Sequence, residues 1–403
     1  MTESSVSETI TSAGVTAPGG FRASGITAGL KASGKPDLAI VVNDGPLQAG
    51  AAVFTANRVV GAPVIWSRQV VADGVISAIV LNSGGANVFT GPEGFADSHH
   101  TAEMVAAGLG ISAGDVVVCS TGLIGVRLAH ETLFAGIAPA IDALSTDGGP
   151  DAATAIMTTD TVPKTAHVTV QDESGTWTVG GMAKGAGMLA PALATMLAVV
   201  TTDAVVDAAQ ADATLRAATR TTFDRIDSDG AMSTSDTVTL LASGASGVTP
   251  DPAAFAAAVT EVCARLARAL IADAEGASHD VAVRVLGASS EDAAVAVARA
   301  VTRSNLVKAA LFGNDPNWGR IIAQVGTVPE DVAPFDPTLL DVTINGVQVC
   351  RASAVAEDPA GVDLAAHREV HIDIHLHAGD AEATVWTNDL THDYVHENSA
   401  YST

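Results

Sequence analysis

Short hydrophobic runs recur along the chain and are bounded by Gly, Asp, Asn or Ser. Most of these runs are rich in Val, Ile and Thr, a composition and length typical of β-strands. The pattern predicts strands over residues 38–42, 76–81, 116–120, 167–171, 196–201, 237–241, 281–286, 340–344, 370–377 and 383–387.

Alanine-rich segments between these runs follow a helical period. In residues 252–274 apolar positions recur every three or four residues, as an amphipathic helix requires, and Asp251 precedes them as a candidate cap. Ser290 stands in the same place before another such segment. These segments predict helices over residues 97–108, 127–145, 206–222, 252–274 and 290–303. Because strands and helices mix without regular βαβ spacing, we expect an α+β fold of stacked layers.

A glycine-rich segment that turns apolar, residues 180–200, divides the chain near its middle. Its only charged residue is Lys184. The apolar part, residues 188–200, is too short to cross a bilayer, so we expect it in the protein interior. Residues 1–20 are polar and predict a loosely ordered arm, and they lack the basic and apolar regions of a signal peptide.

Charge and cysteine content narrow the possible partners. Lys and Arg total 20 and Asp and Glu total 45, which gives a net charge of −25. Nucleic acids and acidic membrane surfaces need clustered basic residues, so we expect neither as a partner. Three widely spaced cysteines, Cys119, Cys263 and Cys350, do not suit a disulfide framework and favour a reducing cytoplasm.

Two residues of the middle segment are candidates for chemistry. Lys184 precedes its glycines, which does not match a phosphate-binding P-loop, where the Lys follows them. A lysine usually lies on the surface, but in a partly desolvated site it binds a carboxylate well. Thr195 is either an ordinary strand residue or an N-terminal nucleophile, because cleavage before it would free an α-amine that can deprotonate its hydroxyl.

Two further patterns allow both a structural and a functional interpretation. Residues 116–125 run from a strand into a glycine-rich turn, which either connects two elements or aims backbone N–H groups at an oxyanion. His371, His375 and His377 alternate on one predicted strand and suggest a metal site, yet side chains two apart on a strand are about 7 Å apart. We therefore expect a solvated sheet face there, and neither a metal nor another cofactor.

Several of these segments resemble the ornithine acetyltransferase family of arginine biosynthesis, whose members are also called glutamate N-acetyltransferases. The run KGAGMLAPALATML, residues 184–197, is similar to that family's self-cleavage and nucleophile motif. Gly85, Ala231 and Met232 depart from the family's usual residues. The other stretches that carry the resemblance are residues 57–58, 62–64, 120–125, 157–164, 307–320 and 398–403.

The resemblance implies a fold and a processing event. The fold is a layered α/β sandwich in which residues 1–20 form the arm. The precursor cleaves itself between Ala194 and Thr195, which gives an α chain ending at residue 194 and a β chain of residues 195–403. Both chains, with residues 21–194 as the ordered part of the first, stay in one folded unit that can carry a smaller C-terminal subdomain.

The resemblance also implies the reaction. Thr195 takes the acetyl group from N2-acetyl-L-ornithine and passes it to L-glutamate in a ping-pong scheme. Thr121 and Gly122 form the oxyanion hole. Acetyl-CoA is a further candidate donor, and a homo-oligomer of αβ units is the expected assembly. The implied substrate contacts are Thr161, Lys184, Thr195, Glu275, Asn398 and Thr403.

Other function classes give different expectations for the same chain. An amidohydrolase or aminopeptidase of this fold would transfer the acyl group to water in place of glutamate. A metal-binding protein centred on the histidines would hold stoichiometric metal. A non-enzymatic, alanine-rich structural domain would remain one intact polypeptide.

Overall fold

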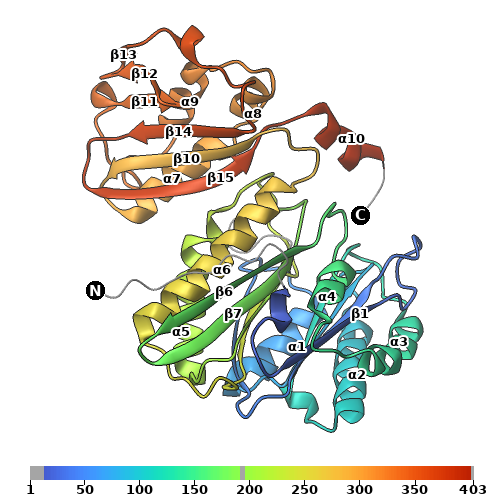
Figure 1. Cartoon of the computed structure of the whole chain (residues 1–403). Helices are drawn as coiled ribbons and strands as arrows, with labels where there is room; N and C mark the ends of the chain where they lie inside the picture. Colours follow the sequence, from blue (N-terminus) through green and yellow to red (C-terminus); the bar gives the residue numbers. More distant parts are fainter. Residues whose placement is uncertain (1–12, 191–195, 401–403) are drawn as a thin grey trace.

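The computed structural model describes residues 13–190 and 196–400. Within these residues the chain forms three β-sheets: two lie in a larger body, and the third lies in a smaller C-terminal body, drawn in orange and red in Figure 1. The cleavage site expected at Ala194 and Thr195 lies outside the described residues, as does Thr403.

The larger body contains two mixed sheets. The first has the order β1-β2-β4-β5 and the second the order β3-β9-β8-β7-β6. Neighbouring strands are antiparallel except β4 with β5 and β8 with β9, which are parallel. The strand bounds are β1 (Phe21–Ile26), β2 (Leu38–Asn43), β3 (Ala49–Phe54), β4 (Ala78–Ser83), β5 (Val116–Thr121), β6 (Lys164–Asp172), β7 (Gly175–Lys184), β8 (Leu197–Thr202) and β9 (Thr237–Ala242).

The two sheets pack face to face. One buried cluster joins Ile79 and Cys119 of the first sheet to Met182, Val199 and Leu241 of the second. Every residue of β2, β4, β5, β8 and β9 is buried, because helices cover the opposite face of each sheet. Strands buried on both faces are mostly hydrophobic, and this explains why the sequence shows them as nearly continuous apolar runs and not as alternating ones.

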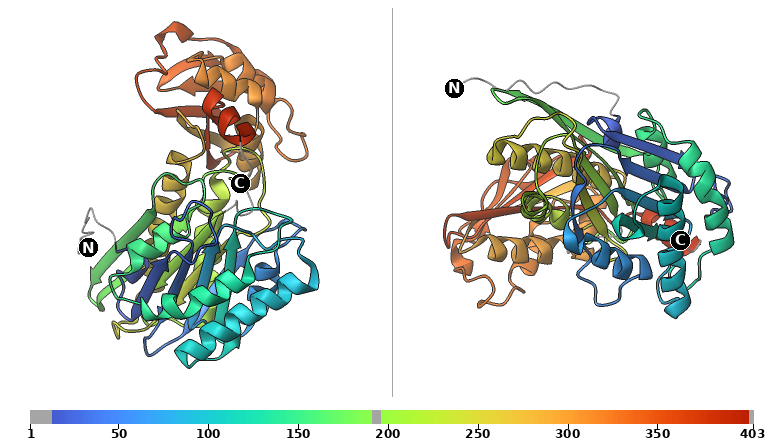
Figure 2. Two further views of the ribbon diagram at one scale, coloured as in Figure 1. Left: turned by 90° about the vertical axis from the view of Figure 1, so that its right-hand side faces the viewer. Right: turned by 90° about the horizontal axis from the view of Figure 1, so that it is seen from below.

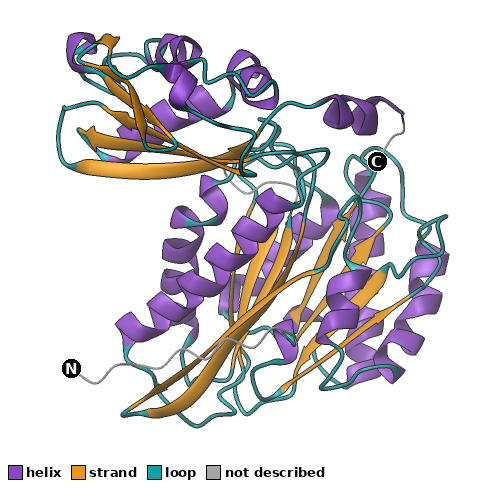
Figure 3. Ribbon diagram, turned by 45° about the horizontal axis from the view of Figure 1, so that its top comes forward, coloured by secondary structure: helices purple, strands orange, loops and turns teal. Residues whose placement is uncertain are grey.

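Helices form the two outer layers of the larger body, as Figure 3 shows. Leu133 and Val105 pack with Val80 on the outside of the first sheet, whereas Leu215 and Phe255 belong to the cluster outside the second sheet. The result is a four-layer α/β/β/α sandwich, which confirms the expected α+β layered class. The helices of this body are α1 (Ala62–Val70), α2 (Gly91–Leu109), α3 (His130–Asp142), α4 (Gly149–Ala155), α5 (Ala208–Thr221) and α6 (Pro252–Ala272).

The C-terminal body has a sheet of its own (Figure 2), and its buried residues form a separate hydrophobic core. Its sheet has the order β13-β12-β11-β14-β10-β15, and its last helix, α10, returns toward the larger body (Figure 1). Its strands are β10 (Asp280–Ala288), β11 (Asp341–Ile344), β12 (Val347–Arg351), β13 (Ala354–Val355), β14 (Glu369–His375) and β15 (Ala381–Asn388). Its helices are α7 (Glu291–Thr302), α8 (Asn305–Phe312), α9 (Trp318–Val325) and α10 (His392–Ala400).

Local details of the sequence interpretation are partly confirmed. Asp251 accepts hydrogen bonds from two backbone N–H groups at the start of α6, and Ser290 caps α7 in the same way. Residues 13–20, which we assigned to a loose arm, are packed instead, because Val15 is fully buried and accepts a hydrogen bond from the Thr201 hydroxyl.

His371 and His375 share one face of β14 as we expected, but His377 does not. β14 ends at His375, and His377 follows it with a left-handed φ of 53°. His377 Nε2 lies 2.9 Å from the Asp341 carboxylate, within hydrogen-bond distance, while the His375 ring packs against the His377 ring. The prediction that residues 370–377 form one strand is therefore wrong at its end.

Candidate active site

Two strands of the larger body end opposite one another, one in each sheet. Lys184 is the last residue of β7 and Thr121 the last of β5. Met182 and Cys119, each two residues earlier, both face the core between the sheets. Because side chains alternate along a strand, Lys184 and Thr121 point into the same space between the sheets. The Lys184 ammonium lies 3.4 Å from Thr121 Oγ1.

The glycine after Thr121 lies against a second turn. Gly122 has a φ of +130°, and a Cβ there would lie 2.6 Å from the Gly85 backbone nitrogen. Gly85 N–H in turn donates to the Thr121 carbonyl at 2.9 Å. Only glycine fits this position without strain, since both the backbone conformation and the close approach exclude a side chain. The two turns therefore hold Thr121 and Gly122 at the end of the sandwich.

The Lys184 side chain is buried, with 1% of its surface exposed. It donates to Thr158 Oγ1 at 2.7 Å and lies 3.9 Å from the Asp160 carboxylate. Burial lowers the pKa of Lys184, and the charge of Asp160 acts in the opposite direction. The ammonium is thus enclosed by two hydroxyls with one carboxylate at a slightly greater distance.

Asp160 is the centre of a buried charge network. One of its oxygens accepts from Lys164 Nζ at 2.6 Å and from Gly185 N–H at 2.7 Å, and the other accepts from Thr158 N–H at 2.9 Å. Burial raises the pKa of this carboxyl, but Lys184, Lys164 and the hydrogen bonds outweigh it and lower the pKa to about 2. Asp160 is therefore a carboxylate at neutral pH. Its hydrogen bonds hold the backbone at Thr158 and at Gly185, next to the Lys184 ammonium.

Asp273, just beyond α6, extends this network to the protein surface. It accepts from Lys164 Nζ at 2.6 Å, and it also accepts from Thr161, through the backbone N–H at 3.0 Å and through the hydroxyl. Thr161 itself is exposed. The exposed hydroxyl is thus held in place by a partly buried carboxylate.

Glu275 and Asn398 meet although they come from different bodies. Asn398, on α10, donates its amide N–H to Glu275 Oε2 at 2.9 Å. Glu275 N–H binds the Ala186 carbonyl at 3.0 Å, and a Cβ at Gly187 would collide with the Glu275 carboxylate at 2.5 Å. This contact brings the return of α10 seen in Figure 1 to the segment that follows Lys184.

The residue after Thr195 is well anchored. Met196 is buried, and its N–H donates to Asp236 Oδ1 at 2.9 Å. The strand that follows, β8, pairs with Lys184 through Leu197. Asp236 is fully buried, and burial raises its pKa well above the usual value. The chain therefore enters the second sheet next to the end of β7.

The structure brings most of the predicted site residues together and adds others. Thr121, Lys184 and Thr161 are linked through one hydrogen-bonded network, and Glu275 contacts Asn398 beside it. Ala194, Thr195 and Thr403 lie outside the described residues. The residues that we had not assigned a role are Thr158, Asp160, Lys164, Asp236 and Asp273. The run of residues 157–164 was a recognisable motif, but only the fold shows which of its charges meet.

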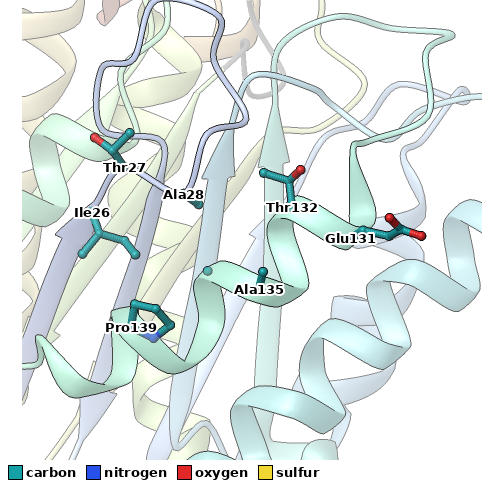
Figure 4. A pocket seen from close by; sticks show the side chains of 8 residues that line it. Ile26, Thr27, Ala28, Glu131, Thr132, Ala135 and Pro139 are labelled. Atoms are coloured by element: carbon teal, nitrogen blue, oxygen red, sulfur yellow. The ribbon is translucent and has the colours of Figure 1, made fainter.

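A separate cavity lies away from the network around Lys184. A cavity of about 400 Å³ lies between the end of β1 and α3, lined by residues such as Ile26, Thr27 and Glu131 (Figure 4). It shares no residue with the network around Lys184.

Among the described residues, no group of three His, Cys, Asp or Glu side chains is placed to hold a metal ion. In the same part of the chain, no helix is long and apolar enough to cross a membrane.

Comparisons with known proteins match nearly the whole chain. The model of the ArgJ family matches residues 22–403. A protein of Streptomyces coelicolor called arginine biosynthesis bifunctional protein ArgJ is 60% identical over 388 residues, which cover 96% of this chain and 99% of that protein. A protein of Thermobifida fusca with the same name is 58% identical over 389 residues, covering 96% of this chain and 100% of that one.

A solved structure matches part of the chain. The ornithine acetyltransferase of Mycobacterium tuberculosis, crystallised with ornithine, is 53% identical. The match covers 47% of this chain and 98% of the solved one, with a TM-score of 0.43.

Proposed function

The chain belongs to the ArgJ family of arginine-biosynthesis enzymes, and from this premise we propose that it transfers the acetyl group of N2-acetyl-L-ornithine to L-glutamate. The observation that carries the proposal is the meeting of Lys184, Thr121 and the anchored Met196 at one end of the sandwich. The Thr121 hydroxyl and the buried Lys184 ammonium thus lie together. Lys184 also pairs with Leu197, the residue after Met196.

The proposed reaction begins with self-cleavage. The hydroxyl of Thr195 attacks the carbonyl of Ala194, the peptide C–N bond breaks, and water hydrolyses the resulting ester. This leaves Thr195 with a free α-amine, which then takes the proton of the same hydroxyl when that hydroxyl attacks the acetyl carbonyl. L-Ornithine leaves with a proton on its α-nitrogen. The α-amine of L-glutamate attacks the acetyl-Thr195 ester and yields N-acetyl-L-glutamate.

Thr121 and Gly122 are the proposed oxyanion hole. The support is their rigid presentation, since the turn at Gly85 fixes the carbonyl of Thr121 and excludes any side chain at Gly122. Donors held in place before the reaction stabilise the negative oxygen of a tetrahedral intermediate without reorganising. Removal of one such donor typically lowers kcat by about 10²–10³-fold.

We propose that the substrate contacts lie near this position. Lys184 supplies a positive charge for the α-carboxylate, and Glu275 supplies a negative charge for the side-chain ammonium of ornithine. Asn398 and Thr161 are neutral side chains that each donate to a neighbouring carboxylate, which leaves the side-chain oxygen of each as an acceptor for the substrate. We assign Thr403 to the same set, from the resemblance of the tail alone.

Further properties belong to the proposal as well. The relatives are named bifunctional, which supports acetyl-CoA as a second acetyl donor to glutamate. A cytoplasmic location and a homo-oligomer of αβ units complete the proposal. Kinetics with acetyl-CoA in place of acetylornithine test the second donor. Cell fractionation tests the location, and the molecular mass in solution tests the assembly.

An acceptor assay tests the proposed function. Purified protein is incubated with N2-acetyl-L-ornithine, with and without L-glutamate, and products are separated by chromatography. We expect N-acetylglutamate and ornithine in equal amounts. An amidohydrolase of the same fold would release acetate at a rate that does not depend on glutamate, and that result would overturn the transferase assignment.

A further inference from the structure

We propose that Lys184 is part of the oxyanion hole, where it fixes the direction of the Thr121 hydroxyl and places a positive charge behind it. The inference rests on the proposed acetyl transfer and deepens it. It assigns Lys184 a task in the transition state, in addition to any contact with the substrate carboxylate.

The hydrogen-bonding capacity of the two groups determines the direction of the hydroxyl. An ammonium group only donates, so Thr121 Oγ1 must accept from Lys184. A hydroxyl has one hydrogen, and a hydrogen directed at a cation would be repelled. The Thr121 hydrogen therefore points away from Lys184. A hydroxyl hydrogen that is not directed at Lys184 is available as a donor to a developing oxyanion.

The fold enforces this contact between the sheets. Lys184 and Thr121 end their strands on facing sheets, and both are 1% exposed. After Lys184 the chain turns sharply, with Gly185 at a φ of +153° and its N–H bound to Asp160. The ammonium thus has little freedom to leave Thr121, and the interaction is formed before substrate binds.

The positive charge of Lys184 is only partly compensated. Asp160, its nearest carboxylate, directs its short hydrogen bonds to Lys164, Gly185 and Thr158, and lies 3.9 Å from the Lys184 ammonium. The described hydrogen-bond acceptors of Lys184 are the neutral hydroxyls of Thr158 and Thr121. A buried cation whose short hydrogen bonds go to neutral hydroxyls gains further when a negative charge forms nearby, because water does not screen the interaction.

A cycle of substitutions tests the coupling. Lys184→Met is made in the wild type, in Thr121→Ser, which keeps the hydroxyl, and in Thr121→Ala, which removes it. We expect Lys184→Met to lower kcat about 100-fold in the first two backgrounds and less than about 10-fold in Thr121→Ala. Lys35→Met, at an exposed position, is the matched control and should leave kcat unchanged.

The kinetic constants distinguish this role from carboxylate binding alone. A lysine that only binds the α-carboxylate would raise KM for acetylornithine, leave kcat unchanged and act independently of residue 121. Equal losses of kcat in the Ser and Ala backgrounds would likewise overturn the proposal. Cleavage is monitored by intact mass for each variant, and kcat is expressed per cleaved molecule.

Folding and the proposed function are controlled separately. If circular dichroism shows that Lys184→Met is unfolded, Lys184→Gln replaces it, because the amide keeps a donor without the charge. The expected loss is then about tenfold and again requires the residue 121 hydroxyl. An inactive wild type would overturn the proposed function, whereas an active wild type with independent losses overturns only the role assigned to Lys184.

Discussion

Replacement of Asp160 by Asn is the perturbation whose effect the structure defines best. The carboxylate accepts hydrogen bonds from Lys164, Gly185 and Thr158, and it is the nearest carboxylate to the Lys184 ammonium. The amide would keep an acceptor but lose the charge. Two buried lysines would then share the single carboxylate of Asp273, which contacts only Lys164 directly.

The expected loss of stability follows from the pKa. The network lowers the pKa of Asp160 from 3.8 to about 2, which corresponds to about 2 kcal/mol of stability for the charged form. Removing one partner of a buried ion pair typically costs about 3–5 kcal/mol, because the other charge is left without compensation. We therefore expect Asp160→Asn to lower the free energy of unfolding by about 3 kcal/mol.

Urea unfolding monitored by circular dichroism measures this effect. Asp331→Asn, at an exposed position, is the matched control and should change stability by less than about 0.5 kcal/mol. The pH dependence gives a second readout. Since the folded-state pKa is depressed, the contribution is complete above pH 4 and is lost as the pH falls from about 4 to 2. Asp160→Asn should show a flatter profile in that window.

Two outcomes would refute this reasoning. An Asp160→Asn variant as stable as the wild type at neutral pH would mean that the carboxylate is not needed to compensate the lysines. A variant that is destabilised but keeps the wild-type loss between pH 4 and 2 would assign that titration to other carboxyl groups.

Three further predictions concern the site and the fold. Gly122→Ala should destabilise the protein by about 1–3 kcal/mol and nearly abolish transfer, because φ is +130° and the new Cβ would meet Gly85. Urea denaturation measures the loss of stability and kcat measures the loss of transfer. Gly361→Ala, where a Cβ would meet no other atom, is the control. Glu275→Ala should raise KM for acetylornithine and leave self-cleavage intact. An uncleaved precursor on a gel would show that Glu275 is needed for cleavage and would contradict its assignment to substrate binding alone. Asp251→Ala should cost about 1 kcal/mol, measured by urea denaturation, through loss of the α6 cap, without changing kcat.

The sequence predicts the elements whose pattern comes from burial. The long helix α6 and the all-buried strands β2, β5, β8 and β9 lie within one or two residues of their predicted bounds. Strand β7 was missed, because Gly180 and Gly181 interrupt its hydrophobic pattern. The structure explains the glycine at 180, since a Cβ there would lie 2.1 Å from the Gly14 carbonyl oxygen. Close approach of distant backbone is invisible in a local pattern.

The candidate site also contains residues that the sequence predicts and residues whose role only the fold reveals. Thr121, Gly122, Lys184 and Glu275 could be proposed from motifs that resemble a known family. The role of Asp160 could not, because its importance depends on charges that meet only in the fold: Lys164 comes from the start of β6 and Lys184 from the end of β7. Sequence separation hides such a network even where each residue belongs to a recognisable stretch.

Intact mass measured under denaturing conditions, after incubation with N2-acetyl-L-ornithine, tests the central claim most directly. At about 0.1 kDa per residue, cleavage before Thr195 gives chains of about 19 and 21 kDa. We predict that only the heavier chain gains the mass of one acetyl group, that L-glutamate removes it, and that Thr195→Ala remains one uncleaved and unacetylated chain. A wild-type protein that stays at 40.4 kDa and carries no acetyl group would contradict the account.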